Sequence, residues 1–437
     1  MRNIARVFVL LTVCAAFSPA AKAAQDTERP LPFRTAVELA IKNSALTGVS
    51  QNDLHRSRAS VSQAKDYFIP QLVFGSGLGF SYGFPLSLEG AAPAIFNVTL
   101  QGGLWNPAQK ENIKAAQSDT SMTTSQNADR RNEVIMEAAL SYIQLDLLDS
   151  SLSIQREQQA AAAKYQDITT QRVQAGLDSH VELTRAKLAV ARTHLDIVQT
   201  EAAADQLRLR LSQLTGLPIR AIKTSTETIP QLPQVSQDDD LAGQAEQNNV
   251  QVKIADAAAQ AKQHKAESER KQLYPSIDLA AQYAMLSRIN NYDQFFLKFQ
   301  RNNVTAGVAI RVPFFSTAQH SAAEVAKFDA AKARNEALNV KQQVGADTLK
   351  LQRTVEQLSA AKEVAQLEHE LSQADIEAAH AKIESGQATL KDEQNARIAE
   401  HQRYTAYLSS SFDLDKAQVQ LLRQIGDLEH WALGTQH

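Results

Sequence analysis

The chain contains 437 residues, of which 43% are hydrophobic and 21% are charged, and its formal net charge is −3 at pH 7. A chain of this length can form two or three ordinary domains, each with a buried core. The small net charge gives no electrostatic reason to expect nucleic acid or an anionic membrane surface as a partner.

The first 23 residues have the pattern of a signal peptide. A basic start, Met1–Arg6, precedes the apolar run Val7–Phe17, and Ala21-Lys22-Ala23 matches a cleavage site with small residues. The apolar run is too short to cross a bilayer as a helix. Cys14, the one cysteine, lies inside this run, so the mature chain is expected to lack disulfides and thiol chemistry. The sequence leaves open whether Cys14 is ever lipidated.

Two strands are predicted before the first long helical region. Residues 71–82, QLVFGSGLGFSY, alternate apolar side chains with glycine and other small residues. Residues 95–105, IFNVTLQGGLW, alternate in the same way. A period of two is that of an extended strand, so each strand has one apolar face and one small or polar face.

A long helical hairpin is predicted next. No proline occurs between Ala108 and Leu217, and Gly176 interrupts this tract. Because proline breaks helices and glycine ends them, we expect two arms that meet near residue 176, the first about 100 Å long. The return arm carries a heptad pattern typical of a coiled coil, formed by Leu183, Val190, Ile197, Ala204 and Leu211.

The second half of the chain repeats the first. VQAG at Gly176 corresponds to IESG at Gly386, 210 residues later, and the same interval separates Gly216 from Gly426. The repeat predicts strands at residues 276–286 and 303–314 and a second hairpin with its tip near 386. We therefore divide the mature chain into a first repeat (24–216), a linker (217–240), a second repeat (241–430) and a C-terminal tail (431–437).

The four predicted strands favour a membrane location. Asp278 and Arg311 fall on the polar face, which suits a wet lumen better than a buried core. Aromatic residues near the strand ends are typical of membrane interfaces: Tyr67, Phe68, Trp105, Tyr274, Phe314 and Phe315. The apolar faces would contact outer-membrane lipid. Four strands cannot close a barrel, so three copies would be needed to make one of twelve strands. Two soluble hairpins packed on the helical body are the alternative.

Together these features resemble the TolC-like outer-membrane efflux family. The resemblance rests on the signal peptide, the duplicated arrangement of strands and hairpin, and the two tips, Arg172–Lys187 and Lys382–Ala396. It implies a mainly helical fold with a small β portion, in which a homotrimer joins a transmembrane β-barrel to a periplasmic α-barrel. It also implies docking of the tips onto a periplasmic adaptor of an inner-membrane transporter.

The resemblance extends to site residues. Gly176, Leu177 and Gly386 would mark the turns that meet the adaptor. Family members close the periplasmic end with a ring of acidic residues shortly after the second tip glycine, and Asp392 stands there. Asn395 follows on the same helical face. Gln387 stands where a leucine would be closer to the family pattern. Ala388 stands where some members have an arginine that locks the closed tips, which implies a weaker lock.

Catalytic and cofactor sites are not expected. His369, His380 and His401 lie in charged helical segments and lack metal-ligand spacing, so we interpret them as solvated. The cargo stays open between drugs, metal ions and secreted proteins, because the resemblance assigns specificity to the inner-membrane pump. The alternative class of function is a periplasmic coiled-coil scaffold or adaptor without a pore.

Overall fold

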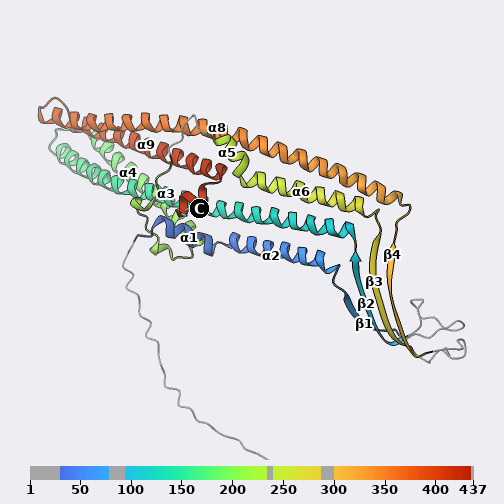
Figure 1. Cartoon of the computed structure of the whole chain (residues 1–437). Helices are drawn as coiled ribbons and strands as arrows, with labels where there is room; N and C mark the ends of the chain where they lie inside the picture. Colours follow the sequence, from blue (N-terminus) through green and yellow to red (C-terminus); the bar gives the residue numbers. More distant parts are fainter. Residues whose placement is uncertain (1–29, 78–93, 234–239, 287–299, 435–437) are drawn as a thin grey trace, which may run out of the picture.

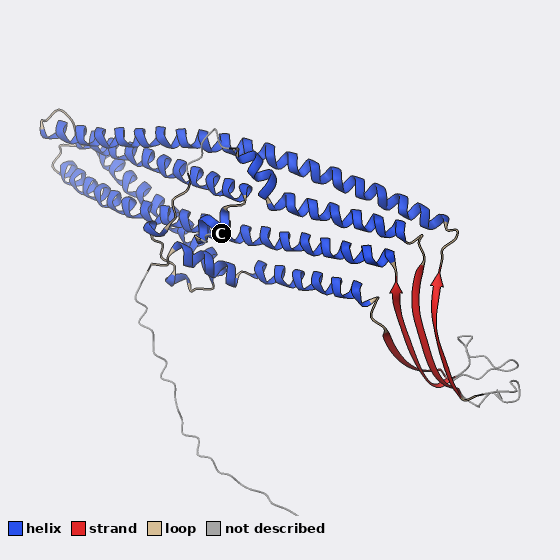
Figure 2. Cartoon of the chain, viewed as in Figure 1, coloured by secondary structure: helices blue, strands red, loops and turns tan. Residues whose placement is uncertain are grey.

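The computed structural model describes residues 30–77, 94–233, 240–286 and 300–434. The predicted signal peptide therefore lies outside the described residues. The chain is elongated, with a small sheet at one end and two helical hairpins at the other (Figure 1). In the described part of the chain, no helix is both long and apolar enough to cross a membrane. The helices and the small sheet confirm the expected fold class (Figure 2).

Four helices lie side by side between the sheet and the middle of the molecule. Their order is α2 (Ala45–Asp66), α3 (Pro107–Gln174), α6 (Val250–Lys271) and α8 (Thr317–Glu384). Each leads to or from one strand, so the order of the helices is also the order of the strands. The shorter helices α1 (Phe33–Asn43), α5 (Leu241–Asn248) and α10 (Leu428–Leu433) pack at the middle.

The sheet is antiparallel with the order β1-β2-β3-β4. Its strands are β1 (Gln71–Gly77), β2 (Ala94–Trp105), β3 (Ser276–Leu286) and β4 (Asn302–Arg311). Residues 78–82 of the first predicted strand lie outside the described residues. The predicted end of the fourth strand at residue 314 is wrong, because the strand stops at Arg311. Pro313 lacks the N–H that a ladder requires, and proline also restricts the residue before it.

The register places most of the large apolar side chains of the four strands on one face. Phe74 pairs with Val98, Val98 with Tyr283, and Tyr283 with Val304. The same face is exposed, for example at Phe74 and at Val304, which is 73% accessible. The opposite face carries Asp278.

The two hairpins have the same construction. The first consists of α3 and α4 (His180–Thr215), and the second of α8 and α9 (Leu390–Ile425). Both first arms contain 68 residues and both return arms contain 36. Each first arm begins at a side-chain cap, in which Asn106 accepts from the Gln109 amide and Ser316 from the Gln319 amide. The duplication read from the sequence is therefore also a duplication in three dimensions.

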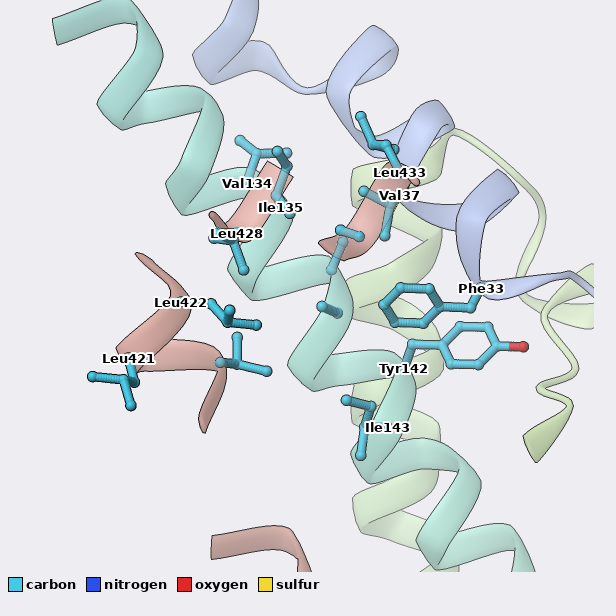
Figure 3. Packing of buried hydrophobic residues seen from close by; sticks show 14 of the residues in the cluster. Phe33, Val37, Val134, Ile135, Tyr142, Ile143, Leu421, Leu422, Leu428 and Leu433 are labelled. Carbon is cyan, nitrogen blue, oxygen red and sulfur yellow. The ribbon is translucent and has the colours of Figure 1, made fainter. Parts of the chain in front are cut away.

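The main hydrophobic core lies where α1, α3, α9 and α10 meet (Figure 3). The ring of Phe33 packs edge-on against Tyr142, with centroids 5.4 Å apart, and also contacts the ring of Trp431. Leu433 is buried in the same cluster. Residues 431–433 thus belong to a packed helix, which corrects the expectation of a tail from residue 431, because their apolar side chains cover α1.

The hydroxyl of Tyr142 forms hydrogen bonds that hold two separate segments against this core. Its hydroxyl donates to the Leu31 carbonyl at 2.6 Å and accepts from the Ser225 amide at 2.9 Å. Burial raises the pKa of Tyr142 above its ordinary value, because the phenolate would be desolvated. The start of the described chain and the linker between the repeats are therefore held by one side chain.

Candidate functional site

The two hairpin tips are built around glycine in the left-handed conformation. Gly176 has a φ of 73° and Gly386 a φ of 75°. In the first tip, the Leu177 amide donates to the Arg172 carbonyl at 2.8 Å, and in the second the Gln387 amide donates to the Lys382 carbonyl at 2.8 Å. Such bonds satisfy carbonyls at the end of a helix, and a side chain would strain the glycine position.

The first tip contains a side-chain ion pair between Arg172 and Asp178, here called the brace, that the second tip does not have. Arg172 Nε lies 2.7 Å from Asp178 Oδ2, and Arg172 Nη2 lies 3.1 Å from Oδ1. These hydrogen bonds hold the pKa of Asp178 below its usual range. Lys382 and Ala388 occupy the equivalent positions of the second tip. Sequence reasoning missed this pair, although the spacing of an arginine and an aspartate across the tip glycine could have indicated it.

Leu177, the predicted adaptor contact, projects from the first tip and is 67% exposed. Its counterpart in the second tip is Gln387, which is also exposed. Gly176 and Gly386 are exposed as well. The structure therefore presents all three predicted contact residues at the ends of the hairpins, away from the sheet (Figure 1).

Asp392, the predicted gate residue, begins α9 as part of a capping box. Asp392 Oδ2 accepts from the Thr389 amide at 2.8 Å and from Thr389 Oγ1 at 2.7 Å. The backbone hydrogen bond, together with that of the hydroxyl, lowers the pKa of Asp392. Asp392 and Asn395 are both exposed, whereas Glu393 pairs with Arg397 at 2.8 Å. The carboxylate at position 392 is thus kept charged and held in place.

The two hairpins touch close to their tips. Glu182, the counterpart of Asp392, lies 3.8 Å from Lys391 Nζ and 2.5 Å from Arg185 Nη1. Farther along, Gln158 Nε2 lies 3.4 Å from Glu400 Oε2, which joins α3 to α9. Glu182 is therefore turned towards the neighbouring hairpin, while Asp392 faces solvent.

The histidines do not all behave as expected. His369 was predicted to be solvated, but its side chain is only 14% exposed, and its Nε2 lies 2.9 Å from Glu400 Oε1. Its ring also stacks on Tyr407. The prediction is wrong because His369 faces the seam between α8 and α9, which its own helix does not reveal. His380 is exposed, and His401 is half-buried. Within the described ranges, no group of histidine, cysteine and carboxylate residues could hold a metal ion.

The aromatic residues near the sheet differ in how far their side chains are exposed. Phe314 and Phe315 are almost wholly exposed, and Trp105 and Tyr274 are also accessible. Phe68 packs edge-on against Tyr67.

Tyr67 stands apart, because its hydroxyl lies 3.0 Å from both Asp278 Oδ1 and Asn106 Nδ2. Its ring covers Gly103, where an added Cβ would lie 2.1 Å from the ring. Tyr67 thus lies on the polar face of the sheet, and its position at a membrane interface stays a prediction. Arg311 Nη2 lies 3.6 Å from Asp278 on the same face.

Comparison with known protein families identifies the family of this chain. The model of the outer membrane efflux protein family matches residues 36–217 and 241–427. Protein CyaE of Bordetella pertussis is 24% identical over 293 residues, which are 65% of this chain and 60% of CyaE. The chain therefore matches less than two thirds of that relative's length.

Solved structures share the fold at low sequence identity. The structure of CusC superposes with a TM-score of 0.75 at 15% identity, covering 91% of this chain and 92% of CusC. The outer-membrane channel OprN gives 0.74 at 14% identity, with 90% of each chain covered. The open state of the Neisseria gonorrhoeae MtrE outer membrane channel gives 0.72 at 15% identity, covering 91% of this chain and 90% of MtrE. Since the family match extends over both repeats and most of the chain, the protein belongs to the outer membrane efflux protein family and resides in the outer membrane.

Proposed function

We propose that the protein is the outer-membrane channel of a tripartite export system. The observation that carries this proposal is the open sheet, whose apolar face is exposed and whose outer strands β1 and β4 each pair with a single neighbour. All ten residues of β4 are exposed. Unpaired backbone groups are very costly in lipid, so the edges need partners. Three copies, joined β4 to β1, would close a barrel of twelve strands.

The edges of the helical part support the same assembly. α4 packs on α3, α3 contacts α9, and α9 packs on α8, which leaves α4 and α8 at opposite edges. α4 exposes apolar side chains seven residues apart at Val181, Leu188 and Leu195. α8 exposes Val364, Leu367 and Leu371. Such stripes favour packing of α8 of one copy against α4 of the next.

The path of export follows from this arrangement. Several structural relatives carry the name outer-membrane channel. In our proposal the helices continue the barrel through the periplasm, and the tips at Gly176, Leu177 and Gly386 dock on a periplasmic adaptor of an inner-membrane transporter. Asp392 and Asn395 would line the closed periplasmic end. Small toxic molecules, drugs or secreted proteins would be the cargo, with no enzymatic step in the channel.

Native mass spectrometry of the detergent-purified protein tests the assembly. A trimer is expected, and a stable monomer would contradict the closed barrel. Cell fractionation distinguishes the outer-membrane channel from the alternative function, because a periplasmic scaffold without a pore would be released from cells without detergent. Co-purification of the inner-membrane transporter would then identify the class of cargo.

A further inference from the structure

A polar pocket lies at the junction between the sheet and the helices (Figure 1). Its volume is about 660 Å³, and it is lined by the start of α3, the end of α6, the start of β3 and the end of β4. Two lining residues, Lys271 and Arg311, are cationic, and none of the described lining residues is acidic. Tyr274 and Ser276 add hydroxyl groups. Such a lining favours a negatively charged ligand.

The carboxylates that pair with these two cations are more shielded than the cations themselves. Glu111 accepts from Lys271 Nζ at 2.7 Å, and its side chain is 7% exposed, whereas that of Lys271 is 26% exposed. Asp278 lies 3.6 Å from Arg311 Nη2, and its side chain is 18% exposed, whereas that of Arg311 is 77% exposed. Each ion pair therefore presents its cation to water.

Neither carboxylate uses up the binding capacity of the cation that it pairs with. Glu111 also accepts from Lys114 at 3.0 Å, so one carboxylate faces two ammonium groups. The contact between Arg311 and Asp278 is longer than a hydrogen bond, and a guanidinium has five N–H donors. A positive charge and several donors thus remain for a ligand.

The first repeat has a neutral residue in the place of Arg311. Arg311 pairs with Ser276 across β3 and β4. In the first repeat, Gln101 pairs with Gln71 across β1 and β2 in the same way. The strand pairing therefore forms without an arginine at this point.

The first repeat also has the opposite charge in the place of Lys271. Helices α2 and α6 both contain 22 residues, and each ends four residues before the proline that precedes its strand. Lys271 is the last residue of α6, and Asp66 is the last residue of α2. Since the duplicated architecture forms with either charge, the two cations indicate a function of this pocket rather than a need of the fold.

The pocket includes part of the polar face of the sheet. Ser276 and Arg311 lie directly opposite each other in the ladder, and Asp278 is on the same face, two residues along β3. In the proposed barrel this face surrounds the lumen. A solute in the lumen would therefore reach the pocket, whereas the lipid would contact the other face.

We propose that this pocket binds a small organic phosphate from the lumen of the channel. A phosphate ester carries a charge of about −1.5 to −2 at pH 7, which two cations can balance. The forked N–H groups of Arg311 would bind two of its oxygens, and Lys271 would bind the third. The pocket is larger than a phosphate group, so the organic part would fit beside Tyr274. This inference rests on the proposed channel for the position of the lumen and adds a class of ligand to it.

Modification of a thiol placed in the pocket tests the proposal. Ser276→Cys is combined with Cys14→Ser, so that the chain contains one cysteine, and the full-length protein is reconstituted in phosphatidylcholine vesicles. A membrane-impermeant sulfonate reagent should modify position 276 at least about fivefold faster than an ammonium reagent of similar size. Glycerol 3-phosphate at about 10 mM should slow the modification about threefold, as expected for a dissociation constant of about 5 mM, and glycerol should have no effect.

Matched variants show whether the two cations cause these effects. Arg311→Gln, which introduces the residue of the first repeat, should make the two reagents equally fast and abolish the protection. Gln71→Cys, the counterpart of Ser276→Cys, should show neither effect. Equal rates of the two reagents at Ser276→Cys, no protection by glycerol 3-phosphate, or protection that persists in Arg311→Gln would overturn the proposal. Protection seen only with phosphatidylglycerol in the vesicles would overturn it too, because the ligand would then be a lipid headgroup.

A cysteine on the apolar face separates failure of this site from failure of the channel. Leu279 pairs with Val308 on that face, which would contact lipid in the closed barrel. The impermeant reagents should leave Leu279→Cys unmodified. Modification of Leu279→Cys would contradict the barrel itself. If Leu279→Cys is unreactive and phosphate has no effect at Ser276→Cys, the barrel stands and the binding site is wrong.

Discussion

Arg172 and Asp178 form a two-pronged ion pair that closes the first hairpin tip. Asp178→Ala, which removes this ion pair, should loosen the tip, because only the backbone hydrogen bonds of the turn, such as that from the Leu177 amide to the Arg172 carbonyl, would then define it. Hydrogen exchange of the Leu177 amide is expected to accelerate. The amide of Gln387, in the unbraced second tip, should not change, and acceleration at both amides would point to global destabilisation instead.

The same pair has a predictable pH dependence. Because the pKa of Asp178 is lowered in the folded protein, the brace is fully formed above the ordinary aspartate value of 3.8. It is lost only as the pH falls through the lower folded value. Exchange at Leu177 should therefore respond to acid below pH 3.8, and a response already complete at pH 5 would contradict the ion pair.

The first tip should meet the adaptor through Leu177. If the predicted signal peptide that contains Cys14 is removed, Leu177→Cys supplies the one thiol of the mature chain, and cross-linking to a periplasmic adaptor is expected in cells. Ser179→Cys, at the start of α4, should cross-link as well. Cross-links from Trp105→Cys but from neither tip position would reverse the proposed orientation.

Asp392 should control cation selectivity at the closed end of the channel. Three symmetry-related carboxylates would attract cations and bind divalent ions. Asp392→Ala should reduce both cation selectivity and divalent block in single-channel recordings. Glu393→Ala is the control, because its carboxylate is paired with Arg397. Since Asp392→Ala also removes the cap of α9, Asp392→Asn, which retains an acceptor, should reproduce the electrical effect. Equal, negligible effects would place the gate elsewhere.

Glu111 should stabilise the contact between α3 and α6. It is 5% exposed and accepts from Lys271 at 2.7 Å, from Lys114 at 3.0 Å and from His264 at 3.0 Å. Burial alone would raise its pKa, but these bonds lower it to about 2. We expect Glu111→Gln to lower the free energy of unfolding by about 2 kcal/mol near neutral pH. The loss should shrink as the pH falls from 4.5 towards 2, because the native carboxylate is then protonated. The exposed neighbour Lys110→Gln should change little.

Tyr142 should anchor the linker between the repeats. Tyr142→Phe retains the ring packed on Phe33 but leaves the Leu31 carbonyl and the Ser225 amide without their hydroxyl partner. A loss of about 1–3 kcal/mol is expected. Faster hydrogen exchange at Ser225 would report it. Tyr283→Phe, on the exposed sheet, is the matched control and should be near neutral.

Much of the fold follows from local patterns in the sequence. The period of two in the strands, the proline-free tracts and the paired glycines at 176 and 386 each reflect backbone geometry that neighbouring residues decide. The duplication then fixed the order of elements. The positions of the two tips were predicted from the same signals, because a glycine between two long helices leaves few conformations open. The role of the tips as adaptor contacts came from the family resemblance and stays a prediction.

Other features depend on contacts between distant segments. Tyr67 faces Asp278 because Gly103 leaves room for its ring, and no pattern near residue 67 reveals that vacancy. His369 is largely shielded from solvent because α9 brings Glu400 and Tyr407 against it.

The equal lengths of the two hairpins have a mechanical consequence. Since both first arms have 68 residues and both return arms 36, the two tips reach a similar level along the molecular axis. In the proposed trimer, six tips would form a ring with approximate sixfold symmetry. The brace between Arg172 and Asp178 recurs at every second tip, so stiff and compliant tips would alternate around that ring. A partner with true sixfold symmetry would then contact tips of two different stiffnesses, and a force applied to the ring would deform it with threefold periodicity.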